Sequence, residues 1–420
     1  MECYNKGYCL VLSGGGAKGV YHLGVWKALK ELGIQVDAFM GTSIGAVIAG
    51  LLAQDSDDSL DDLGASITVN SIISLPDTFV DEGKINVNKE SLSEAQELFR
   101  SLIENKGLDT SPLRQLLVSR IDEDRIRKSG KDLGVVTINL SDLKPREMFI
   151  EEMGEGAIID YLMASAAFPG FRQPVIEGKK YMDGGIVDNI PYAMARQRGY
   201  RRIIVSDISG LGMNRRPEIE GSITIYIKNS INMGGVLDFD HDFMKDFERL
   251  GYLDTLRVFG RLRGYSYFIE PNAEAEAVFA KKLEKAAPAR GTTTFPKNML
   301  HDRNLLLKYL ECAASILEVP RVASYTYGEL ASAIAERKND DEDKIAEIFK
   351  AGSDRKAAII AMLRESMANR IFKGSPYYYF RLMEEFLPKK AGVMPRKTLI
   401  GLFPELPAGM EYLRSVERSN

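Results

Sequence analysis

The strongest constraint on the fold is a pattern that occurs twice near the N-terminus: a short apolar run, a turn rich in small residues, and an apolar helix-like segment. The first copy runs through Tyr8–Leu12, Gly14–Gly19 and Val20–Leu32, whose apolar residues recur at helical spacing. The second begins at Ala38–Met40 and passes, through a serine between two glycines, into Ile44–Ala53. Short buried strands that alternate with helices predict a mainly parallel sheet with helices on its faces.

Strand-like runs recur further along the chain, at Leu133–Leu140, Glu147–Ile150, Lys180–Met182, Arg202–Ser206 and Ile223–Ile227. After about Pro271 the periodicity is helical, in Ala273–Ala286, Asn304–Leu317, Tyr327–Arg337, Glu342–Ala351, Arg355–Arg370 and Tyr377–Phe386. We therefore expect an α/β class protein. A three-layer α/β/α domain with a mainly parallel central sheet would occupy residues 1–320, and a helical C-terminal region of unknown role would occupy 321–420.

Composition narrows the class of protein. A formal net charge of -4 argues against a nucleic-acid partner, which needs a basic excess. Three cysteines, Cys3, Cys9 and Cys312, are too few for a disulfide framework and suit a reducing compartment. The first apolar run resembles a core strand rather than a signal peptide, and no run approaches the ~20 apolar residues of a membrane span. We expect a cytoplasmic protein, for which any lipid contact is peripheral to the membrane.

The sequence G-T-S-I-G, from Gly41 to Gly45, joins the second strand to the following helix. This context is typical of a nucleophile elbow, a sharp turn that exposes the hydroxyl of Ser43. Gly41 and Gly45 would prevent clashes between strand and helix, and the helix N-terminus would offer the Ile44 N–H to a developing oxyanion. The alternative is an ordinary strand-to-helix turn in which the serine caps the helix.

The sequence G-G-G-A-K-G, from Gly14 to Gly19, also lies between a strand and a helix. Successive glycines expose backbone N–H groups, which can bind a phosphate or the oxyanion of a tetrahedral intermediate. The same residues satisfy G-x-G-x-x-G, the dinucleotide fingerprint, which requires an acidic residue at the end of the next strand. Asp37 lies at a suitable distance, but it precedes that strand. A purely structural loop is the third interpretation.

A third feature is the sequence Asp183-Gly184-Gly185, which follows the strand-like run Lys180–Met182. Ligands of open α/β sheets bind beyond the carboxyl ends of the strands, and a carboxylate at a strand end is therefore well placed at an active site. A β-turn aspartate is the alternative. The serine turn, the glycine loop and this carboxylate are all predicted to lie at the same edge of the sheet.

The ordered motifs S-G-G-G-A-K-G, G-T-S-I-G and D-G-G resemble those of patatin-like phospholipases. Further stretches that resemble the family are Tyr21–Gly33, Ala164–Gly170 and Asp188–Pro191. The resemblance covers about residues 7–208, is weak between Gln54 and Asp132, and is not found after about Gly210. One departure is Ile44, where the family often has alanine or glycine.

This resemblance implies a lipid acyl hydrolase, a phospholipase A-type enzyme or a general esterase acting on carboxylic esters, in which Ser43 is the nucleophile and Asp183 the general base. The implied oxyanion hole consists of Gly14, Gly15, Gly16 and Ile44. Implied supporting residues are Lys18, Gly41, Gly45, Gly184 and Gly185. It implies no cofactor and a lipid or acyl-ester substrate. Two alternatives stay open: an acyltransferase or transacylase that uses the same pair, and a non-catalytic lipid-binding or scaffold protein.

A serine–aspartate pair without histidine needs support, because an aspartate with a pKa of about 4 is a weak base at neutral pH. Partial burial would raise that pKa, and an oxyanion donor contributes ~3–4 kcal/mol. The chain has only three histidines. We expect a structural role for His22. His241 or His301 could complete a Ser-His-Asp triad in α/β-hydrolase order, but the charged residues around both histidines favour a solvated surface instead.

The remaining features give open alternatives. No metal is expected, because no cysteine or histidine pair has ligand spacing and the acidic run Asp55–Asp62 lacks the order of a calcium loop. The apolar segment Leu63–Phe79 could line a groove beside the serine, cover it as a lid, or pack in the core. In the C-terminal region, the aromatic run Tyr377–Phe380 near Lys389 and Lys390 suits a membrane surface or, better, helix packing. Head group, acyl length and protein partners are not indicated.

Overall fold

The computed structural model describes residues 6–55, 69–74, 80–81, 84–85, 107–235, 241–286, 303–350, 356–387 and 393–417. The chain divides into two compact units, an N-terminal unit, Met1–Phe259, and a C-terminal unit, Gly260–Asn420. The boundary between these units lies earlier than the domain boundary expected near residue 320. Two helices that precede residue 320, α11 (Ala273–Ala286) and α12 (Arg303–Ile316), pack against the last helix, α17 (Leu406–Glu417), which explains the difference.

An eight-stranded sheet forms the centre of the N-terminal unit, in the order β10-β9-β1-β2-β5-β8-β7, with β6 also paired to β5. The strands are β1 (Tyr8–Leu12), β2 (Val36–Thr42), β5 (Asp132–Asn139), β6 (Lys144–Phe149), β7 (Val175–Ile176), β8 (Lys179–Asp183), β9 (Arg202–Asp207) and β10 (Ile223–Lys228). The five strands from β10 to β5 run parallel, while β6 and β8 are antiparallel to β5. The predicted mainly parallel sheet is thus confirmed.

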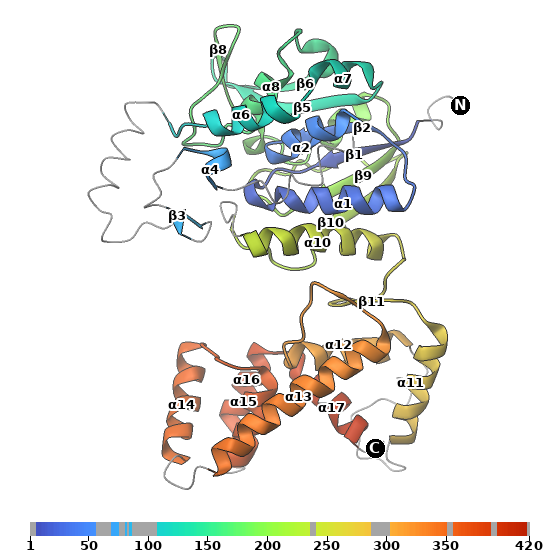
Figure 1. Cartoon of the computed structure of the whole chain (residues 1–420), viewed down its shortest axis with the longest axis vertical. Coiled ribbons are helices and arrows are strands. Elements are labelled where there is room, and N and C mark those ends of the chain that lie inside the picture. Colours follow the sequence, from blue (N-terminus) through green and yellow to red (C-terminus); the bar gives the residue numbers. More distant parts are fainter. Residues whose placement is uncertain are drawn as a thin grey trace, which may run out of the picture. The chain divides into compact units, whose positions relative to one another are not determined.

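Helices cover both faces of this sheet, and those of one face are labelled in Figure 1. One face carries α1 (Val20–Glu31), α2 (Ile44–Ala53), α8 (Ile158–Ser165) and α10 (His241–Val258). On the other face α9 (Tyr192–Gln197) packs against β1 and β2, over a buried apolar cluster that includes Val11, Met40 and Val205. The three-layer α/β/α architecture expected from the sequence is therefore confirmed.

Shorter elements complete the N-terminal unit. They are α4 (Val69–Ile72), β3 (Val80–Asp81), β4 (Lys84–Ile85), α6 (Ser111–Arg120) and α7 (Glu123–Lys128). Pro112 in the first turn favours the start of α6, because its missing N–H group would have no helical partner there. Among the described strands, β3 and β4 pair only with each other.

Helix α10 was not predicted, because its first half is highly charged and resembles a solvated surface segment. Its buried residues recur every three positions, at Met244, Phe247, Leu250 and Leu253. Helix α10 packs along α1, and the two helices lie side by side in Figure 1. An apolar stripe of this kind makes a helix stable through packing even where most of its residues are polar.

The crossing of α1 and α10 is unusually close because a glycine lies at the contact on each helix. A methyl group on Gly24 would clash with the carbonyl oxygen of Glu248 and lie 2.7 Å from the Tyr252 nitrogen. A methyl group on Gly251 would likewise clash with the carbonyl oxygen of Tyr21. Because the neighbouring atoms belong to helix backbone, they cannot move aside without separating the two helices.

The C-terminal unit is helical, as expected. Besides α11, α12 and α17 it contains α13 (Tyr327–Lys350), α14 (Lys356–Asn369), α15 (Pro376–Phe386) and α16 (Val393–Leu402), with the two-residue strands β11 (Phe268–Ile269) and β12 (Ser324–Tyr325). Its core is aromatic and aliphatic, and it includes Tyr377 and Tyr379, both buried. Helix packing, the favoured interpretation of that aromatic run, is therefore confirmed for these two residues, while Lys389 and Lys390 lie outside the described residues.

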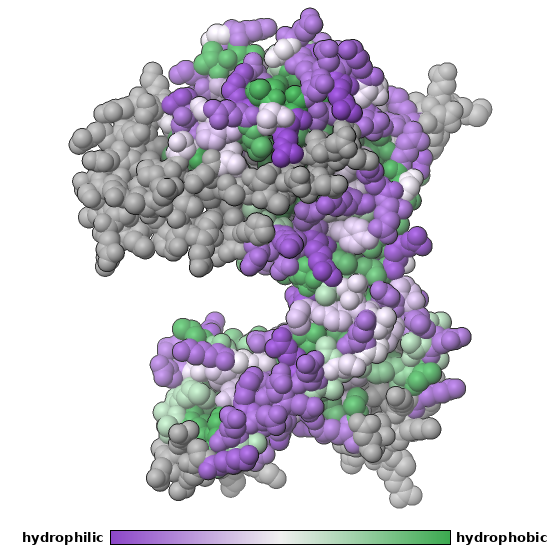
Figure 2. Space-filling view, viewed as in Figure 1, coloured by the Kyte–Doolittle hydropathy of each residue, from purple (hydrophilic) through white to green (hydrophobic). Residues whose placement is uncertain are grey.

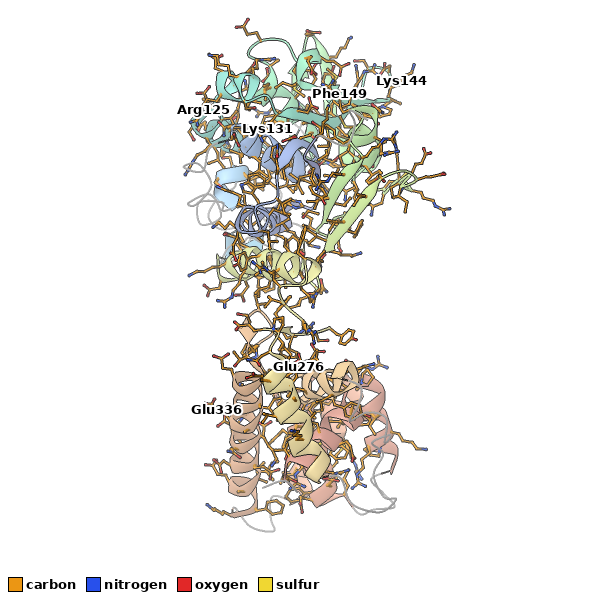
Figure 3. The ribbon with its side chains drawn as sticks, turned by 90° about the vertical axis from the view of Figure 1, so that its right-hand side faces the viewer. Arg125, Lys131, Lys144, Phe149, Glu276 and Glu336 are labelled. Carbon is orange, nitrogen blue, oxygen red and sulfur yellow. The ribbon has the colours of Figure 1, made fainter. Side chains whose placement is uncertain are left out.

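Helix α13 merges two helices that the sequence predicts separately. The sequence also contains a charge run, Asn339–Asp343, that we predict to be solvated surface, and hydrophilic residues do gather along α13 in Figure 2. One member of the run, Asp341, is instead buried, and accepts hydrogen bonds from Ser375 Oγ at 2.5 Å and Lys344 Nζ at 3.0 Å. A second buried carboxylate of this unit, Glu276, labelled in Figure 3, accepts hydrogen bonds from Arg263 and Tyr327. Polar residues thus join helices inside this unit.

Gly24→Ala should destabilise the N-terminal unit by about 1–3 kcal/mol, because an overpacked contact forces backbone shifts. The measurement is the thermal unfolding midpoint followed by fluorescence of Trp26, the only tryptophan, which lies on α1. The matched control is Gly154→Ala, since no atom lies within 4 Å of an added methyl group there. Equal midpoints for the two variants would contradict the close crossing.

Candidate active site

Two strands meet end to end along one edge of β5. Strand β2 pairs with β5 as far as Thr42, opposite Val136, and β8 arrives from the other direction and ends with Asp183 opposite Thr137. Because β6 occupies the other edge of β5 from Gly134 to Asn139, which overlaps both stretches, β2 and β8 must share the remaining edge. The residue after β2 therefore faces the last residue of β8, and Ser43 Oγ donates a hydrogen bond to Asp183 Oδ2 at 2.7 Å.

The backbone of Ser43 has the conformation of a nucleophile elbow. Its φ of 56° and ψ of -129° lie where a residue with a side chain is strained, and such strain is typical of functional sites. The Ser43 N–H donates to Ser165 Oγ at 2.9 Å, and that hydroxyl donates to the Val136 carbonyl at 2.7 Å. Methyl groups on Gly41 or Gly45 would strike the backbone of the helix or of β1, as the G-x-S-x-G pattern predicts.

The glycine loop lies beside Ser43, and its amides are not equivalent. The Gly14 N–H already donates to the Asn189 carbonyl at 3.2 Å. Gly15, Gly16 and Ile44 line the same pocket as the serine hydroxyl. Gly15, Gly16 and Ile44 thus border the serine hydroxyl, whereas the Gly14 N–H is already used in a hydrogen bond and Gly14 does not line the pocket. The N-terminal turn of α2 adds the partial positive charge of a helix start.

Lys18 lies under the loop rather than in the pocket. Its ammonium group donates a hydrogen bond to the Ser209 carbonyl at 3.4 Å, and its side chain is buried. Burial lowers the pKa of Lys18, and the charge of Asp207 opposes that shift. The remaining supporting residues, Gly184 and Gly185, continue the chain from Asp183 in a short 3-10 turn.

The pKa of the Asp183 carboxyl lies closer to neutral pH than that of an exposed aspartate. It is only 4% exposed, and burial raises its pKa from 3.8 to about 6. Hydrogen bonds from Ser43 and from the Gly185 N–H, at 2.7 Å to Oδ1, favour the charged form and limit the rise. A base of this pKa is largely ionised at pH 7 but holds a proton more firmly than an exposed aspartate.

His22 is buried beneath the glycine loop, and its ring contacts neither Ser43 nor Asp183 through a hydrogen bond. Its Nε2 lies 2.9 Å from the Ser13 carbonyl and its Nδ1 lies 2.7 Å from Ser206 Oγ. Because a carbonyl can only accept, Nε2 carries the proton and Nδ1 accepts from the Ser206 hydroxyl. Burial lowers the pKa of His22 to about 4, so the ring is neutral. The expected structural role thus has a definite form: His22 holds the residue that precedes Gly14.

Ser13 connects this histidine to the rest of the loop. Its N–H donates to the Ser206 carbonyl at 3.1 Å, and its Oγ accepts from the Ile208 N–H at 3.0 Å. The start of the glycine loop is therefore fixed by hydrogen bonds to both the end of β9 and helix α1. Sequence reasoning included Ser13, Ser165 and Asn189 only within stretches that resemble the family and gave none of them a role, since nothing in their spacing distinguishes them from ordinary polar residues.

An apolar pocket of about 210 Å³ opens at Ser43 and Asp183. Its apolar lining consists of Ile44, Val47, Ile72, Leu113, Ala166, Phe168, Pro169, Phe171, Ile186 and Leu211. A smaller cavity of about 20 Å³ shares four of these residues and continues along α2 and α6 to Arg120. Ile72 fulfils one part of the expectation for Leu63–Phe79, because it lines the groove. Most of that segment lies outside the described residues.

Several candidate residues are not brought to this site. Asp37 lies at the start of β2, at the opposite end of the strand from Ser43, and its carboxylate accepts the Gly7 N–H at 2.6 Å. The glycine loop therefore lacks the acidic partner of a dinucleotide site. His301 and the side chain of His241 lie outside the described residues. Within the described ranges, no cluster of histidine, cysteine and acidic side chains is suited to holding a metal ion.

The value of kcat/KM for a soluble p-nitrophenyl ester should fall about tenfold per pH unit below a midpoint near pH 6. If Asp183 is the general base that the family resemblance implies, it must be ionised to accept the serine proton, and its raised pKa places the loss of activity at that pH. Asp188 and His22 are the controls, since burial raises the pKa of Asp188 to about 6 and lowers that of His22 to about 4. Asp188→Asn and His22→Gln should both retain the midpoint, and its disappearance in either would contradict the assignment.

His22→Leu should lower kcat about 10- to 100-fold with a smaller change in KM, because a misplaced glycine loop stabilises the oxyanion less well. His22→Gln keeps a donor for the Ser13 carbonyl and should recover most of the loss. The rate of Ser43 labelling by a fluorophosphonate should follow kcat across the two variants. A lower unfolding midpoint with unchanged kcat for the folded protein would show that the histidine only supports the fold.

The described part of the chain contains no helix that is long and apolar enough to cross a membrane. A family model described as "Patatin-like phospholipase" matches residues 10–196. The relatives include "Patatin-like phospholipase domain-containing protein ZK370.4" of Caenorhabditis elegans, 31% identical over 210 residues, and "Patatin-like phospholipase domain-containing protein 6" of Mus musculus, 30% identical over 203 residues. "Lysophospholipase NTE1" of Kluyveromyces lactis is 28% identical over 207 residues.

These matches cover 47–48% of this chain but only 12–14% of each relative. A superposition on the crystal structure of VipD from Legionella pneumophila covers 99% of this chain and 91% of that one, at 13% identity and a TM-score of 0.40, which is too low to support a common function. The family match spans the glycine loop, the serine elbow and the aspartate turn in their expected order. Residues 10–196 are therefore a domain of the patatin-like phospholipase family.

Proposed function

We propose that this protein is a lipid acyl hydrolase that cleaves carboxylic esters of fatty acids through a covalent Ser43 acyl-enzyme. The observation that carries the proposal is the hydrogen bond of 2.7 Å between Ser43 Oγ and Asp183 Oδ2 at an apolar pocket. Both ring nitrogens of His22, the histidine near the glycine loop, are occupied elsewhere, which favours direct proton transfer from serine to aspartate.

In the first half of the reaction, Asp183 accepts the hydroxyl proton while Ser43 Oγ attacks the carbonyl carbon of the ester. The negative charge on the carbonyl oxygen is received by the amides of Gly15, Gly16 and Ile44, where preorganised donors are most effective. When the tetrahedral intermediate collapses, Asp183 returns the proton to the departing alcohol. The acyl group is then held as an ester of Ser43.

The second half repeats these steps with water. Asp183 accepts a proton from the water as its oxygen attacks the acyl carbon, and the same three amides stabilise the new oxyanion. Asp183 then protonates Ser43 Oγ as the acyl–serine bond breaks, which releases the fatty acid and restores the starting state. These protein groups account for every proton transfer in the cycle.

The pocket supports a fatty acyl substrate. Apart from the reacting residues, the glycine backbone and Asn189, its lining is aliphatic and aromatic, as a hydrocarbon chain requires. The smaller cavity, which shares Ile44, Val47, Ile72 and Leu113 with it, extends this apolar surface in one direction. The names of the relatives, phospholipase and lysophospholipase, agree with a lipid ester, and we propose peripheral contact with a lipid surface as its source.

Ser43→Ala should reduce turnover of a p-nitrophenyl acyl ester to the background rate, a loss of more than about 10⁴-fold, because no other hydroxyl or thiol side chain belongs to the described lining of the pocket. A fluorophosphonate should label the parent protein on the peptide that contains Ser43 and leave the variant unlabelled. Ser119→Ala, on the exposed side of α6, is the control and should behave as the parent. Full activity in purified Ser43→Ala protein would refute the proposal.

Two measurements separate the alternatives. Product analysis with glycerol or a lysolipid as acceptor distinguishes hydrolysis from acyl transfer, since both share the acyl-enzyme but differ in the second attacking oxygen. A protein that binds lipid but does not react with the fluorophosphonate would be a lipid-binding or scaffold protein instead.

A further inference from the structure

Three large apolar side chains are exposed around the mouth of the active-site pocket. Leu211 is 69% exposed, Met213 is 61% exposed and Ile186 is 44% exposed. Leu211 and Ile186 also line the pocket. Scattered exposed apolar residues need no explanation, but a group at the entrance to an apolar pocket marks a surface for binding.

The backbone holds these side chains in place. The Met213 N–H donates to the Gly185 carbonyl at 2.9 Å, and the Met213 carbonyl accepts from the Asn189 N–H at 2.8 Å. Leu211 and Met213 belong to the loop from Ser209 to Met213. At the Ser209 end of this loop, the Ser209 carbonyl accepts a hydrogen bond from Lys18, whose buried side chain lies beneath the glycine loop. The loop is therefore tied to the aspartate turn and to the glycine loop while its apolar side chains project outward.

We infer that Ile186, Leu211 and Met213 form a lipid-docking rim, through which the protein inserts into the surface of a bilayer or lipid aggregate. This inference rests on the proposed function. The surface of the rim is continuous with the pocket, because Leu211 and Ile186 belong to both. An acyl chain that leaves the lipid phase would therefore meet these two residues before it reaches Ser43. On the phenylalanine side of the pocket, Pro169 lines it and is also exposed.

The chemistry of the neighbourhood fits a lipid surface. Arg216 is exposed three residues after Met213, where it can approach lipid phosphate groups while the apolar side chains enter the acyl region. Arg215 is held back by Glu147 at 3.2 Å and Asp188 at 3.8 Å. Apolar insertion rather than net charge is therefore the main source of affinity, which predicts binding to zwitterionic lipid.

The rim also differs from the lipid contact suggested by the aromatic run of the C-terminal region. Tyr377 and Tyr379 of that run are buried in the helical core, and cannot enter a membrane without unfolding. Ile371 in the same unit is 62% exposed, close to the value for Met213, and it does not line the active-site pocket. It therefore provides a matched control.

The test is flotation of the full-length chain with phosphatidylcholine vesicles, in a Ser43→Ala background so that the lipid is not consumed. The parent should float with the vesicles. The affinity of the double variant Leu211→Ser, Met213→Ser for the vesicles should be lower by about tenfold or more, since two exposed apolar side chains are lost from the contact. Ile371→Ser should float like the parent. Because no turnover is needed, the result stands whether or not Ser43 is a nucleophile.

A second measurement uses the active protein. The ratio of turnover on vesicle phospholipid to turnover on a soluble short-chain ester should fall about tenfold in Met213→Ser and stay constant in Ile371→Ser. Equal loss on both substrates would show damage to the pocket and overturn the inference. It would also be overturned by unchanged flotation of the double variant, by equal loss in Ile371→Ser, or by a lipid-free dimer that the rim substitutions convert to monomer.

Discussion

The site depends on one constraint of strand pairing: β2 and β8 share a single edge of β5. Neither strand is long enough to occupy that edge alone, and the two arrive from opposite directions. Their ends consequently meet at neighbouring residues of β5, Val136 and Thr137, although 140 positions separate Ser43 from Asp183 in the chain. The hydrogen bond between the pair is a result of sheet register more than of any local motif, and the strained serine turn is held between these strand ends.

Much of this arrangement could be predicted from the sequence. The parallel strands and the helices α1 and α2 follow from apolar runs bounded by glycine, and the elbow follows from its spacing of serine and glycines. The partner of the serine could be named only through the family resemblance, because no local pattern in Asp183-Gly184-Gly185 distinguishes a base from a turn residue. The different amide environments of Gly14 and Gly15 depend on Asn189, far along the chain, and no pattern around the loop indicates such a contact.

The failures of sequence reasoning have physical causes. Helix α10 escaped prediction because its polar residues outnumber the buried stripe, and packing on α1 rather than intrinsic propensity holds it. In the C-terminal unit, Asp341 lies in a charge run typical of exposed helix, yet hydrogen bonds to Ser375 and Lys344 allow it to be buried. In both cases a distant segment supplies the partner, and periodicity along a single segment carries no information about it.

The burial of Asp183 destabilises the folded protein in the protonation state that the proposed reaction needs, which is the ionised carboxylate. A carboxyl whose pKa rises from 3.8 to about 6 on folding stabilises the folded state while it is protonated, and that stabilisation disappears as the pH rises from about 4 to about 6. Above pH 6 the ionised aspartate leaves the domain less stable by roughly 3 kcal/mol than an unperturbed carboxyl would. The hydrophobic core must offset that deficit. Substitutions that replace the carboxyl group of Asp183 would therefore tend to make the fold more stable and the enzyme less active.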